Sequence, residues 1–318
     1  MGRFIDMLRG DKNTLYYIGN GFDLFHDNVK SKFIHFYSWL NLKDKDHEQF
    51  ASMMERIYPD SGIHGNLLWT DFEESLGNFN IDKVHQIFAG KEEDGFFDEG
   101  YQKRAANIVH DTFSNISIYL KEWAKQIDIE KVKPLLTLGR ESRYLTFNYT
   151  LLLEKVYKIS PDYILHIHNS IEDDEPLIVG HDKPFPQYFD DTENTNIQKS
   201  QENLAKEITM IKKPVDQVIK RHRDFFNSLG NITKIIVFGH SLSSIDMPYF
   251  KEVLYHVHDN AEWYFTVYND EAKEKYKSIV DHFISYFNNP KVCGVSQYRN
   301  KIKFENCKYI VISEIYRE

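Results

Sequence analysis

The hydrophobic pattern of the chain switches repeatedly between short apolar runs and longer stretches with helical spacing. The short runs, typical of strands buried on both faces, are residues 15–18, 143–147, 163–168, 177–180, 232–238, 263–268 and 308–313. Apolar residues spaced three or four apart predict helices at 30–40, 46–58, 69–88, 101–127, 151–158, 190–228, from 247 onward and at 270–287. Strands that alternate with helices imply right-handed crossovers. The pattern therefore predicts an α/β fold with a doubly wound, Rossmann-type, mostly parallel sheet.

Turn-forming residues divide this pattern further. The helix over 69–88 is expected to break near Gly77 and Asn78, and Pro214 is expected to interrupt the helical stretch over 190–228. The acidic, glycine-containing residues 90–100 are expected to form a loop. No convincing strand falls within 46–140, so this region is predicted to be a helical insertion that acts as a lid. Residues 1–45 and 141–318 are then the α/β domain.

Composition narrows the class of protein. With 318 residues and 15% aromatic residues, the chain can bury one large core, or one core plus a sizeable insertion. A formal charge of −9 argues against a broad grip on nucleic acid, so a nucleic-acid partner is not expected. The sequence has no run of about 18 apolar residues and no signal-peptide pattern, so we expect a cytoplasmic protein without membrane contact. Cys293 and Cys307 are too few for a four-cysteine zinc site and are expected to be unpaired.

The first strand leads directly into the glycine-containing segment Gly19-Asn20-Gly21-Phe22-Asp23. Glycines let a backbone approach a ligand closely, and amides at the mouth of such a loop suit phosphate. The dehydrogenase fingerprint is not present, because Leu24 stands at the position of its third glycine. The alternative interpretation is an ordinary turn between a strand and a helix.

Three further strands end in polar or glycine-containing turns, namely Asn148-Tyr149-Thr150, His168-Asn169 and Gly239-His240-Ser241. Ligands of parallel sheets bind beyond the carboxyl ends of the strands, so these turns are expected to share one edge with the first loop. Each has a plainer interpretation. Asn148 or Thr150 could cap the following helix, and His168 could be satisfied by backbone groups.

Five motifs in order along the chain carry a family resemblance. They are I-G-N-G-F-D at 18–23, W-x-x-F-E at 69–73, F-N-Y-T at 147–150, H-I-H-N at 166–169 and G-H-S-L-x-x-x-D at 239–246. Together they resemble the abortive-infection AbiH family of phage-defence proteins and, more remotely, the sirtuin-like NAD-binding proteins. The glycine that usually follows the second histidine of the H-I-H motif is replaced here by Asn169.

The resemblance implies a sirtuin-like fold and a function as an NAD hydrolase in phage defence, with no metal expected. Asn148 would orient the nicotinamide ribose or a water molecule, and His168 would be the general base. The residues implied to contact NAD are Gly19, Asn20, Gly21, Phe22, Asp23, Gly239, His240 and Ser241. Thr150 stands where sirtuin-like proteins often carry an acidic residue, so Asp23 is expected to serve in its place. True sirtuins, which deacetylate proteins, carry a four-cysteine zinc ribbon. The absence of those cysteines here argues against protein deacetylation.

Other functions remain open. A non-catalytic module could bind NAD or a related nucleotide as a sensor. A serine hydrolase could use Ser241, although Ser243 replaces the last glycine of a nucleophile elbow. A nuclease would gather carboxylates around a metal, the candidates being Asp23, Glu73, Glu74 and Asp246. Because uncontrolled loss of NAD is toxic, an NAD hydrolase would also need a regulatory protein partner or a homo-oligomeric assembly step.

Overall fold

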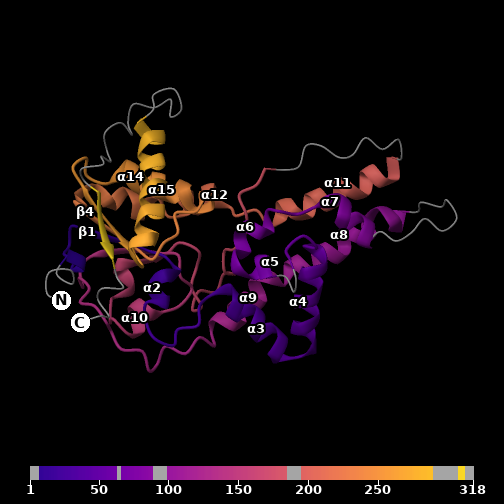
Figure 1. The fold of residues 1–318 in the computed structure, drawn as a ribbon, viewed down its shortest axis with the longest axis horizontal. Helices are drawn as coiled ribbons and strands as arrows, with labels where there is room; N and C mark the ends of the chain where they lie inside the picture. Colours follow the sequence, from indigo (N-terminus) through magenta and orange to yellow (C-terminus); the bar gives the residue numbers. More distant parts are fainter. Residues whose placement is uncertain (1–6, 63–65, 89–98, 185–194, 289–306, 312–318) are drawn as a thin grey trace. The chain divides into compact units, whose positions relative to one another are not determined.

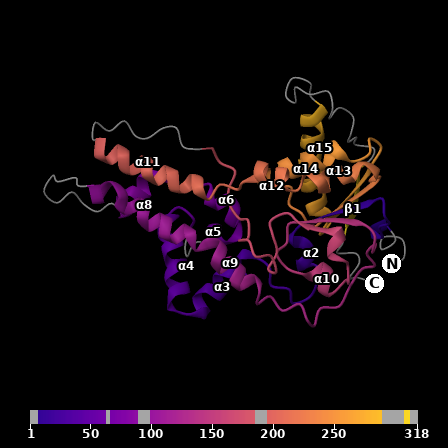
Figure 2. The same ribbon diagram turned by 180° about the vertical axis from the view of Figure 1, so that it is seen from behind.

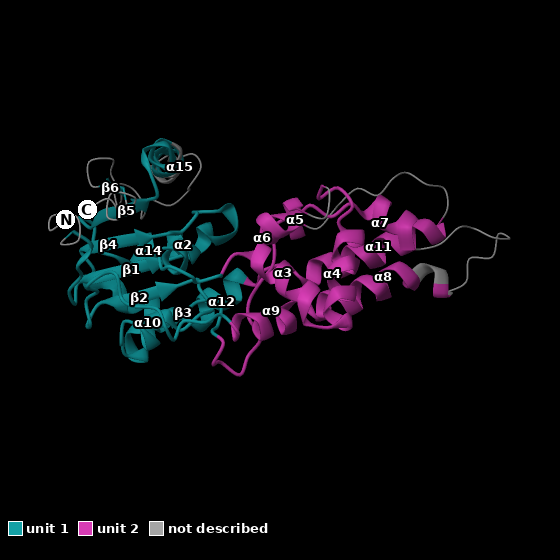
Figure 3. Ribbon diagram, turned by 60° about the horizontal axis from the view of Figure 1, so that its bottom comes forward, with its two compact units in different colours: residues 1–30, 127–170, 215–318 teal, residues 31–126, 171–214 magenta. Residues whose placement is uncertain are grey.

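The computed structural model describes residues 7–62, 66–88, 99–184, 195–288 and 307–311. Within them the chain forms two compact units (Figure 3). The first consists of residues 1–30, 127–170 and 215–318, and the second of residues 31–126 and 171–214.

The first unit contains a six-stranded sheet in which every described pair of neighbouring strands is parallel. The strands are β1 (Thr14–Ile18), β2 (Arg143–Thr146), β3 (Ile164–His166), β4 (Lys234–Phe238), β5 (Glu262–Val267) and β6 (Cys307–Val311). Their order across the sheet is β3-β2-β1-β4-β5-β6, which can be followed in Figure 3. This is the strand order of a doubly wound, dinucleotide-binding α/β fold. The predicted α/β class with a parallel sheet is confirmed.

Helices cover both faces of this sheet, as Figures 1 and 2 show for α2 on one side and α14 on the other. The helices of this unit are α2 (Asn20–Leu24), α10 (Leu152–Lys155), α12 (Val215–Arg221), α13 (Arg223–Asn227), α14 (Met247–His256) and α15 (Asp270–Asn288). Short 3-10 helices lie at Pro161–Tyr163, Ser228–Asn231 and Ser244–Asp246. All five residues of β1 are buried, as expected for the central strand of a covered sheet.

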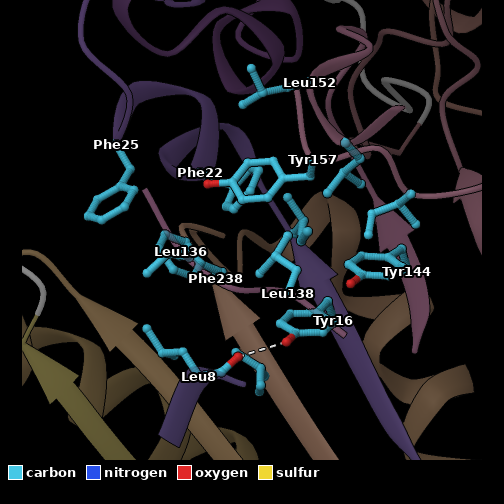
Figure 4. Close-up of a cluster of buried hydrophobic side chains, with 14 of the residues drawn as sticks. Leu8, Tyr16, Phe22, Phe25, Leu136, Leu138, Tyr144, Leu152, Tyr157 and Phe238 are labelled. Carbon is cyan, nitrogen blue, oxygen red and sulfur yellow. Dashed lines mark hydrogen bonds between the residues drawn. The ribbon is translucent and has the colours of Figure 1, made fainter. Parts of the chain in front are cut away.

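Alternate residues of β1 pack on opposite faces of the sheet. Tyr16 stacks on Tyr144 with 4.8 Å between the ring centroids, and its hydroxyl donates to the carbonyl of Leu8 at 2.7 Å (Figure 4). Phe22 of α2 joins this apolar cluster. The next residue along β1, Tyr17, packs instead against Phe250 of α14. The two faces of β1 are therefore held by different helices.

The second unit is helical over its described residues. Its helices are α3 (Phe33–Lys43), α4 (Lys45–Ile57), α5 (Asn66–Thr70), α6 (Phe72–Leu76), α7 (Ile81–Phe88), α8 (Glu99–Ser114), α9 (Ile116–Ala124) and α11 (Thr195–Met210). Helices α8 and α11 lie side by side although about a hundred residues separate them (Figures 1 and 2). The predicted breaks at Gly77 and Pro214 are confirmed, because α6 ends at Leu76 and α12 begins at Val215.

Aromatic side chains form the interior of this unit. Trp69 and Phe72 are buried and stacked at 5.2 Å, and both rings contact Phe36 of α3. Next to them in the sequence, Glu73 forms an ion pair with Lys213 at 2.7 Å, and the Lys213 side chain is fully buried. The W-x-x-F-E motif therefore contributes two core residues and one end of a buried ion pair.

Two expected elements are wrong. Residues 177–180 do not form a strand. Directly after them, a single β-bridge joins His181 to Lys212, which follows α11, and this pairing does not extend into a ladder. The helix expected over 101–127 is two helices, which separate at Asn115. The loop expected at 90–100 lies mostly outside the described residues.

The helical unit also differs in extent from the expected insertion at 46–140. It begins at Ser31, ends its first segment at Gln126 and takes in residues 171–214. That the insertion acts as a lid stays a prediction. None of the helices described here is both long and apolar enough to cross a membrane.

Candidate functional site

The carboxyl ends of β1, β2, β3 and β4 lie at one edge of the sheet, because these neighbouring strands are parallel. The chain passes from β1 to β2 and β3 on one side, then crosses to β4 on the other side of β1. A reversal of this kind is a topological switch point, where open α/β sheets bind their ligands. The loops after β1 and β4 meet at this point.

Three glycines make that meeting possible. A Cβ atom on Gly19 would lie 2.5 Å from the Cα of His240, and one on Gly21 would lie 2.6 Å from the Cα of Gly239. Gly239 itself has a φ of +63°, the left-handed region that favours glycine. The contact of one backbone with the other therefore accounts for the glycines of both loops.

This contact also engages the loop amides that were expected to bind phosphate. The amide of Gly19 donates to the carbonyl of Phe238 at 2.9 Å, and that of Gly21 donates to the carbonyl of Gly239 at 2.8 Å. Phe22 directs its ring into the core against Phe238, whereas Asn20 is exposed. A phosphate group at this loop would need donors other than the Gly19 and Gly21 amides.

Asp23 is the centre of the first of two polar clusters, which we call the carboxylate cluster (Asp23, Asn148, Thr150, Glu154 and His166). Asp23 is buried, with 1% of the residue exposed. It accepts one hydrogen bond from Nδ2 of Asn148 and one from the Thr150 hydroxyl, each at 2.7 Å. Since α10 has Leu151 at its N-cap, Asn148 and Thr150 serve this carboxylate and do not cap the helix.

The surroundings of Asp23 change its acidity. Burial raises the pKa of its carboxyl group to about 6, against the opposing effect of the hydrogen bonds from Thr150 and Asn148. Two nearby charges have smaller effects: that of His166 lowers the pKa of Asp23, and that of Glu154 raises it. A carboxyl group with a pKa near neutrality can both accept and release a proton at physiological pH.

The hydrogen bonds of Asn148 are accounted for with one exception. Its backbone amide donates to the Thr146 hydroxyl at 3.2 Å, and its carbonyl accepts from Nδ1 of His166 at 2.9 Å. Its side-chain nitrogen donates to Asp23. Its side-chain oxygen is buried and has no hydrogen-bond partner among the described residues. A buried acceptor left unpaired costs about 1–3 kcal/mol, and such atoms call for a specific explanation.

His166 belongs to the same cluster and was not anticipated from the sequence. Its Nδ1 faces the Asn148 carbonyl, and its Nε2 lies 2.8 Å from a carboxylate oxygen of Glu154. A ring that faces an acceptor at each nitrogen can donate from both only when it is protonated, and Glu154 would then be its ion-pair partner. The available signal was its place two residues before His168 in the H-I-H motif.

The second group, the imidazole cluster, consists of His168, His240 and Asp246 with the aromatic residues around them. Nε2 of His168 lies 3.7 Å from one oxygen of Asp246, and Nε2 of His240 lies 3.7 Å from the other. Both distances exceed that of a direct hydrogen bond. Nδ1 of His240 accepts from the Leu242 amide at 2.9 Å, so the proton of the neutral His240 ring is on Nε2, facing Asp246.

Aromatic rings pack around these imidazoles. Phe147 contacts His168 and His240 edge-on, with ring centroids 5.2 and 4.3 Å away. Tyr249 also contacts His168 edge-on, and Tyr17 contacts His240 in the same way. The pKa of the Tyr17 hydroxyl is raised well above its ordinary value by burial, then by the charge of Asp246. Tyr17 therefore remains a neutral phenol at the side of this cluster.

The structure thus distributes the predicted catalytic residues over two clusters. Strands β2 and β3 are hydrogen-bonded neighbours, which brings the ends that carry Asn148 and His168 to adjacent positions. The Asn148 side chain joins Asp23, and His168 joins Asp246 and His240. Ser241 is exposed. Among the residues described, no group of three or more histidine, cysteine, aspartate or glutamate side chains could hold a metal ion.

Comparison with known proteins identifies the family. Residues 15–267 match the bacteriophage abortive infection family AbiH. The match runs from β1 to the last residue of β5, so it includes both polar clusters and segments of both units. No curated protein and no solved structure matches the chain. The family match covers well over half of the sequence, and the chain therefore belongs to the bacteriophage abortive infection family AbiH.

Proposed function

We propose that this AbiH protein is an NAD hydrolase that cleaves the bond between nicotinamide and ribose during abortive infection. The products would be nicotinamide and ADP-ribose, and the reaction would take place in the cytoplasm. A sirtuin-like relationship is part of this proposal. So is control of the activity by a regulatory protein partner or by homo-oligomer assembly, because loss of NAD harms the cell.

The observation that carries the proposal is the set of ionisable side chains at the switch point of a sheet with dinucleotide-binding strand order. At this edge lie a buried carboxyl group, Asp23, and an unpaired carboxamide oxygen, that of Asn148. The imidazole rings of His168 and His240, which both face the Asp246 carboxylate, lie at the same edge. Side chains with altered pKa values cluster preferentially at functional sites.

The chemistry of this reaction needs few groups. The nicotinamide ring leaves with the electron pair of the broken bond and becomes neutral, so it requires no proton from an acid. Water forms the new bond to the sugar carbon and loses a proton to a base. We assign the base to His168, whose ring lies beside Asp246, and the orientation of a hydroxyl group or water to Asn148. An anionic carboxylate such as Asp23 favours the positive charge that develops on the sugar.

NAD would need contacts for its ribose and for its pyrophosphate. The unpaired oxygen of Asn148 suits a hydroxyl donor of a ribose. The amides of Gly19 and Gly21 are already engaged, so the pyrophosphate would depend on other groups. Exposed Asn20 and Ser241, next to these glycine turns, remain candidates for contacts with the nucleotide.

A second function, a sensor that binds NAD without cleaving it, is favoured by one observation. The Asn148 side chain is hydrogen-bonded to Asp23, whereas the His168 ring faces Asp246, so the two side chains lie in different clusters. A sensor needs only the binding edge of the sheet, whereas a hydrolase needs both side chains at one ribose.

The two functions are separated by incubating the purified full-length protein with NAD and measuring nicotinamide by chromatography, alongside calorimetric titration with NAD. Hydrolysis predicts nicotinamide and ADP-ribose in equal amounts, and loss of both in Asn148→Ala and in His168→Ala. Heat of binding without product supports the sensor. The absence of both binding and cleavage would contradict both functions.

A further inference from the structure

The carboxamide of Asn148 is held in one orientation by its neighbours. The Asp23 carboxylate can only accept hydrogen bonds when ionised, so the Asn148 atom 2.7 Å from it must be the amide nitrogen. The second Asp23 oxygen is held by the Thr150 hydroxyl, also at 2.7 Å. Because nitrogen and oxygen of a carboxamide are fixed relative to each other, this contact determines where the oxygen points.

The backbone of Asn148 is fixed as well. Its backbone amide is hydrogen-bonded to the Thr146 hydroxyl, and its carbonyl is hydrogen-bonded to His166. The other ring nitrogen of His166 contacts Glu154. These hydrogen bonds, together with the one to Asp23, restrain both the backbone and the side chain of Asn148. The one polar atom left over is the buried Oδ1, for which the described residues supply no donor.

We propose that Asp23 and Thr150 are positioning residues that lock Asn148 with its side-chain oxygen directed at a hydroxyl group or water of the substrate. This inference rests on the proposed function, and it assigns Asn148 the role of an acceptor in that reaction. The lock requires ionised Asp23. Once protonated, the carboxyl group can donate as well as accept, and the amide of Asn148 is free to take either orientation.

The lock therefore depends on pH, and a few ionisable side chains near Asp23 influence its ionisation. His166 of β3 and Glu154 of α10 act on the pKa of Asp23 in opposite directions, and the backbone amide of His26 donates to the Asp23 carbonyl. The ring of His26 is bonded to the Phe22 carbonyl and to the Tyr157 hydroxyl. With the pKa of Asp23 raised to about 6 by burial, the lock is closed at pH 7.5 and opens as the pH falls through 6.

Thr150→Val tests this role, since valine keeps the shape of threonine but removes the hydroxyl group. Loss of that hydrogen bond, which lowers the pKa of Asp23, moves the pKa upward. NAD turnover in this variant should fall about threefold below that of the wild type at pH 6.5 and recover above about pH 8.5. Thr150→Ser retains the hydroxyl group and should keep the wild-type profile. A structural defect would lower turnover at every pH.

A second measurement does not depend on activity. The side-chain amide resonances of Asn148, assigned by their absence in Asn148→Ala, should titrate in the wild-type protein with a midpoint near pH 6. The midpoint should move upward in Thr150→Val. Resonances that do not change between pH 5 and 8, or a Thr150→Val profile equal to that of the wild type, would overturn the proposal. A protein that cleaves no NAD but shows this titration would refute the proposed function while supporting the positioning role.

Discussion

At the scale of single residues, Asp23 connects the stability of the protein to pH. The pKa of its carboxyl group is about 6 in the folded protein, because of burial, and about 4 in an unfolded chain. Between pH 6 and pH 4 the folded state binds a proton that the unfolded state does not bind. The contribution of Asp23 to stability therefore increases as the pH falls through this range and decreases as it rises.

Asp23→Asn removes this ionisation while keeping groups that can bond to Asn148 and Thr150. We expect the variant to be more stable than the wild type by about 1–3 kcal/mol at pH 7.5, since it buries no charge. Most of this difference should disappear at pH 4.5. Urea unfolding at the two pH values measures the effect. Asp27→Asn, at an exposed position, is the matched control. A gain of equal size at both pH values would contradict the account.

His168 gives the second prediction at this scale. As the proposed base it should be needed for turnover, so His168→Ala should lower kcat by at least about a hundredfold, the usual effect of a general base. His258→Ala alters an exposed histidine and should leave kcat unchanged. Steady-state rates of nicotinamide release measure both. Near wild-type turnover in His168→Ala would remove this residue from the mechanism.

The sequence identified the polar residues that follow the strands but not their pairing. Asn148 and His168 were placed at one edge because parallel strands end there, a rule that depends only on chain direction, and their proposed roles came from the family resemblance. Which partner each side chain selects depends on the rotamer and on helices distant in the sequence. The pairing of Asn148 with Asp23 and the roles of His166 and Glu154 could not be found from local patterns.

At the scale of elements, the loops after β1 and β4 depend on glycine. Gly239→Ala would place a Cβ atom 2.4 Å from the backbone of Gly21, at a φ of +63°. We expect a loss of at least about 2–3 kcal/mol in the free energy of unfolding. Gly230→Ala is the matched control, because a Cβ atom there would meet nothing within 4 Å. Equal stability of the two variants in urea would contradict the close contact of the loops.

The same contact changes an expectation drawn from the sequence. A glycine in an open phosphate-binding loop could be replaced at little cost in stability, and Gly21→Val would then be a clean test of phosphate binding. A Cβ atom on Gly21 lies 2.6 Å from Gly239. Gly21→Val is therefore expected to damage the fold, and loss of nucleotide binding in this variant would be uninformative.

The ion pair of Glu73 with Lys213 gives a prediction for the helical elements. Lys213→Met keeps most of the buried side chain but leaves the carboxylate of Glu73 without its cation. We expect a loss of about 2–4 kcal/mol, because the Glu73 carboxylate loses its cation in a mostly buried position. The double variant with Glu73→Gln should recover part of this loss. Lys206→Met alters an exposed lysine and should change the free energy of unfolding very little.

Most strands and helices were predictable because apolar periodicity reports burial directly. The exception at 177–180 is informative. Leu177 is buried, so the apolar signal is real, but the neighbouring chain offers only the bridge of His181 with Lys212 in place of a ladder. A short apolar run predicts burial, but whether it forms a strand depends on a neighbouring segment that can pair with it.

At the scale of the whole molecule, the helical unit interrupts the α/β unit twice. The first interruption lies between α2 and β2, and the second between β3 and β4. The first was predicted as 46–140 from the lack of strands. The second was missed because α11 has the same helical pattern as any crossover helix, and its packing on α8 and α7 assigns it to the other unit.

The central claim is NAD hydrolysis by groups at the carboxyl edge of the parallel sheet. The most direct test incubates the purified full-length protein with NAD, with and without excess chelator, and quantifies nicotinamide by chromatography. The account predicts equal amounts of nicotinamide and ADP-ribose, unchanged by chelator and abolished in Asn148→Ala. Intact NAD after incubation with a protein shown by calorimetry to bind it would contradict hydrolysis and support the sensor. Product that disappears on addition of chelator would contradict the proposed metal-independent chemistry.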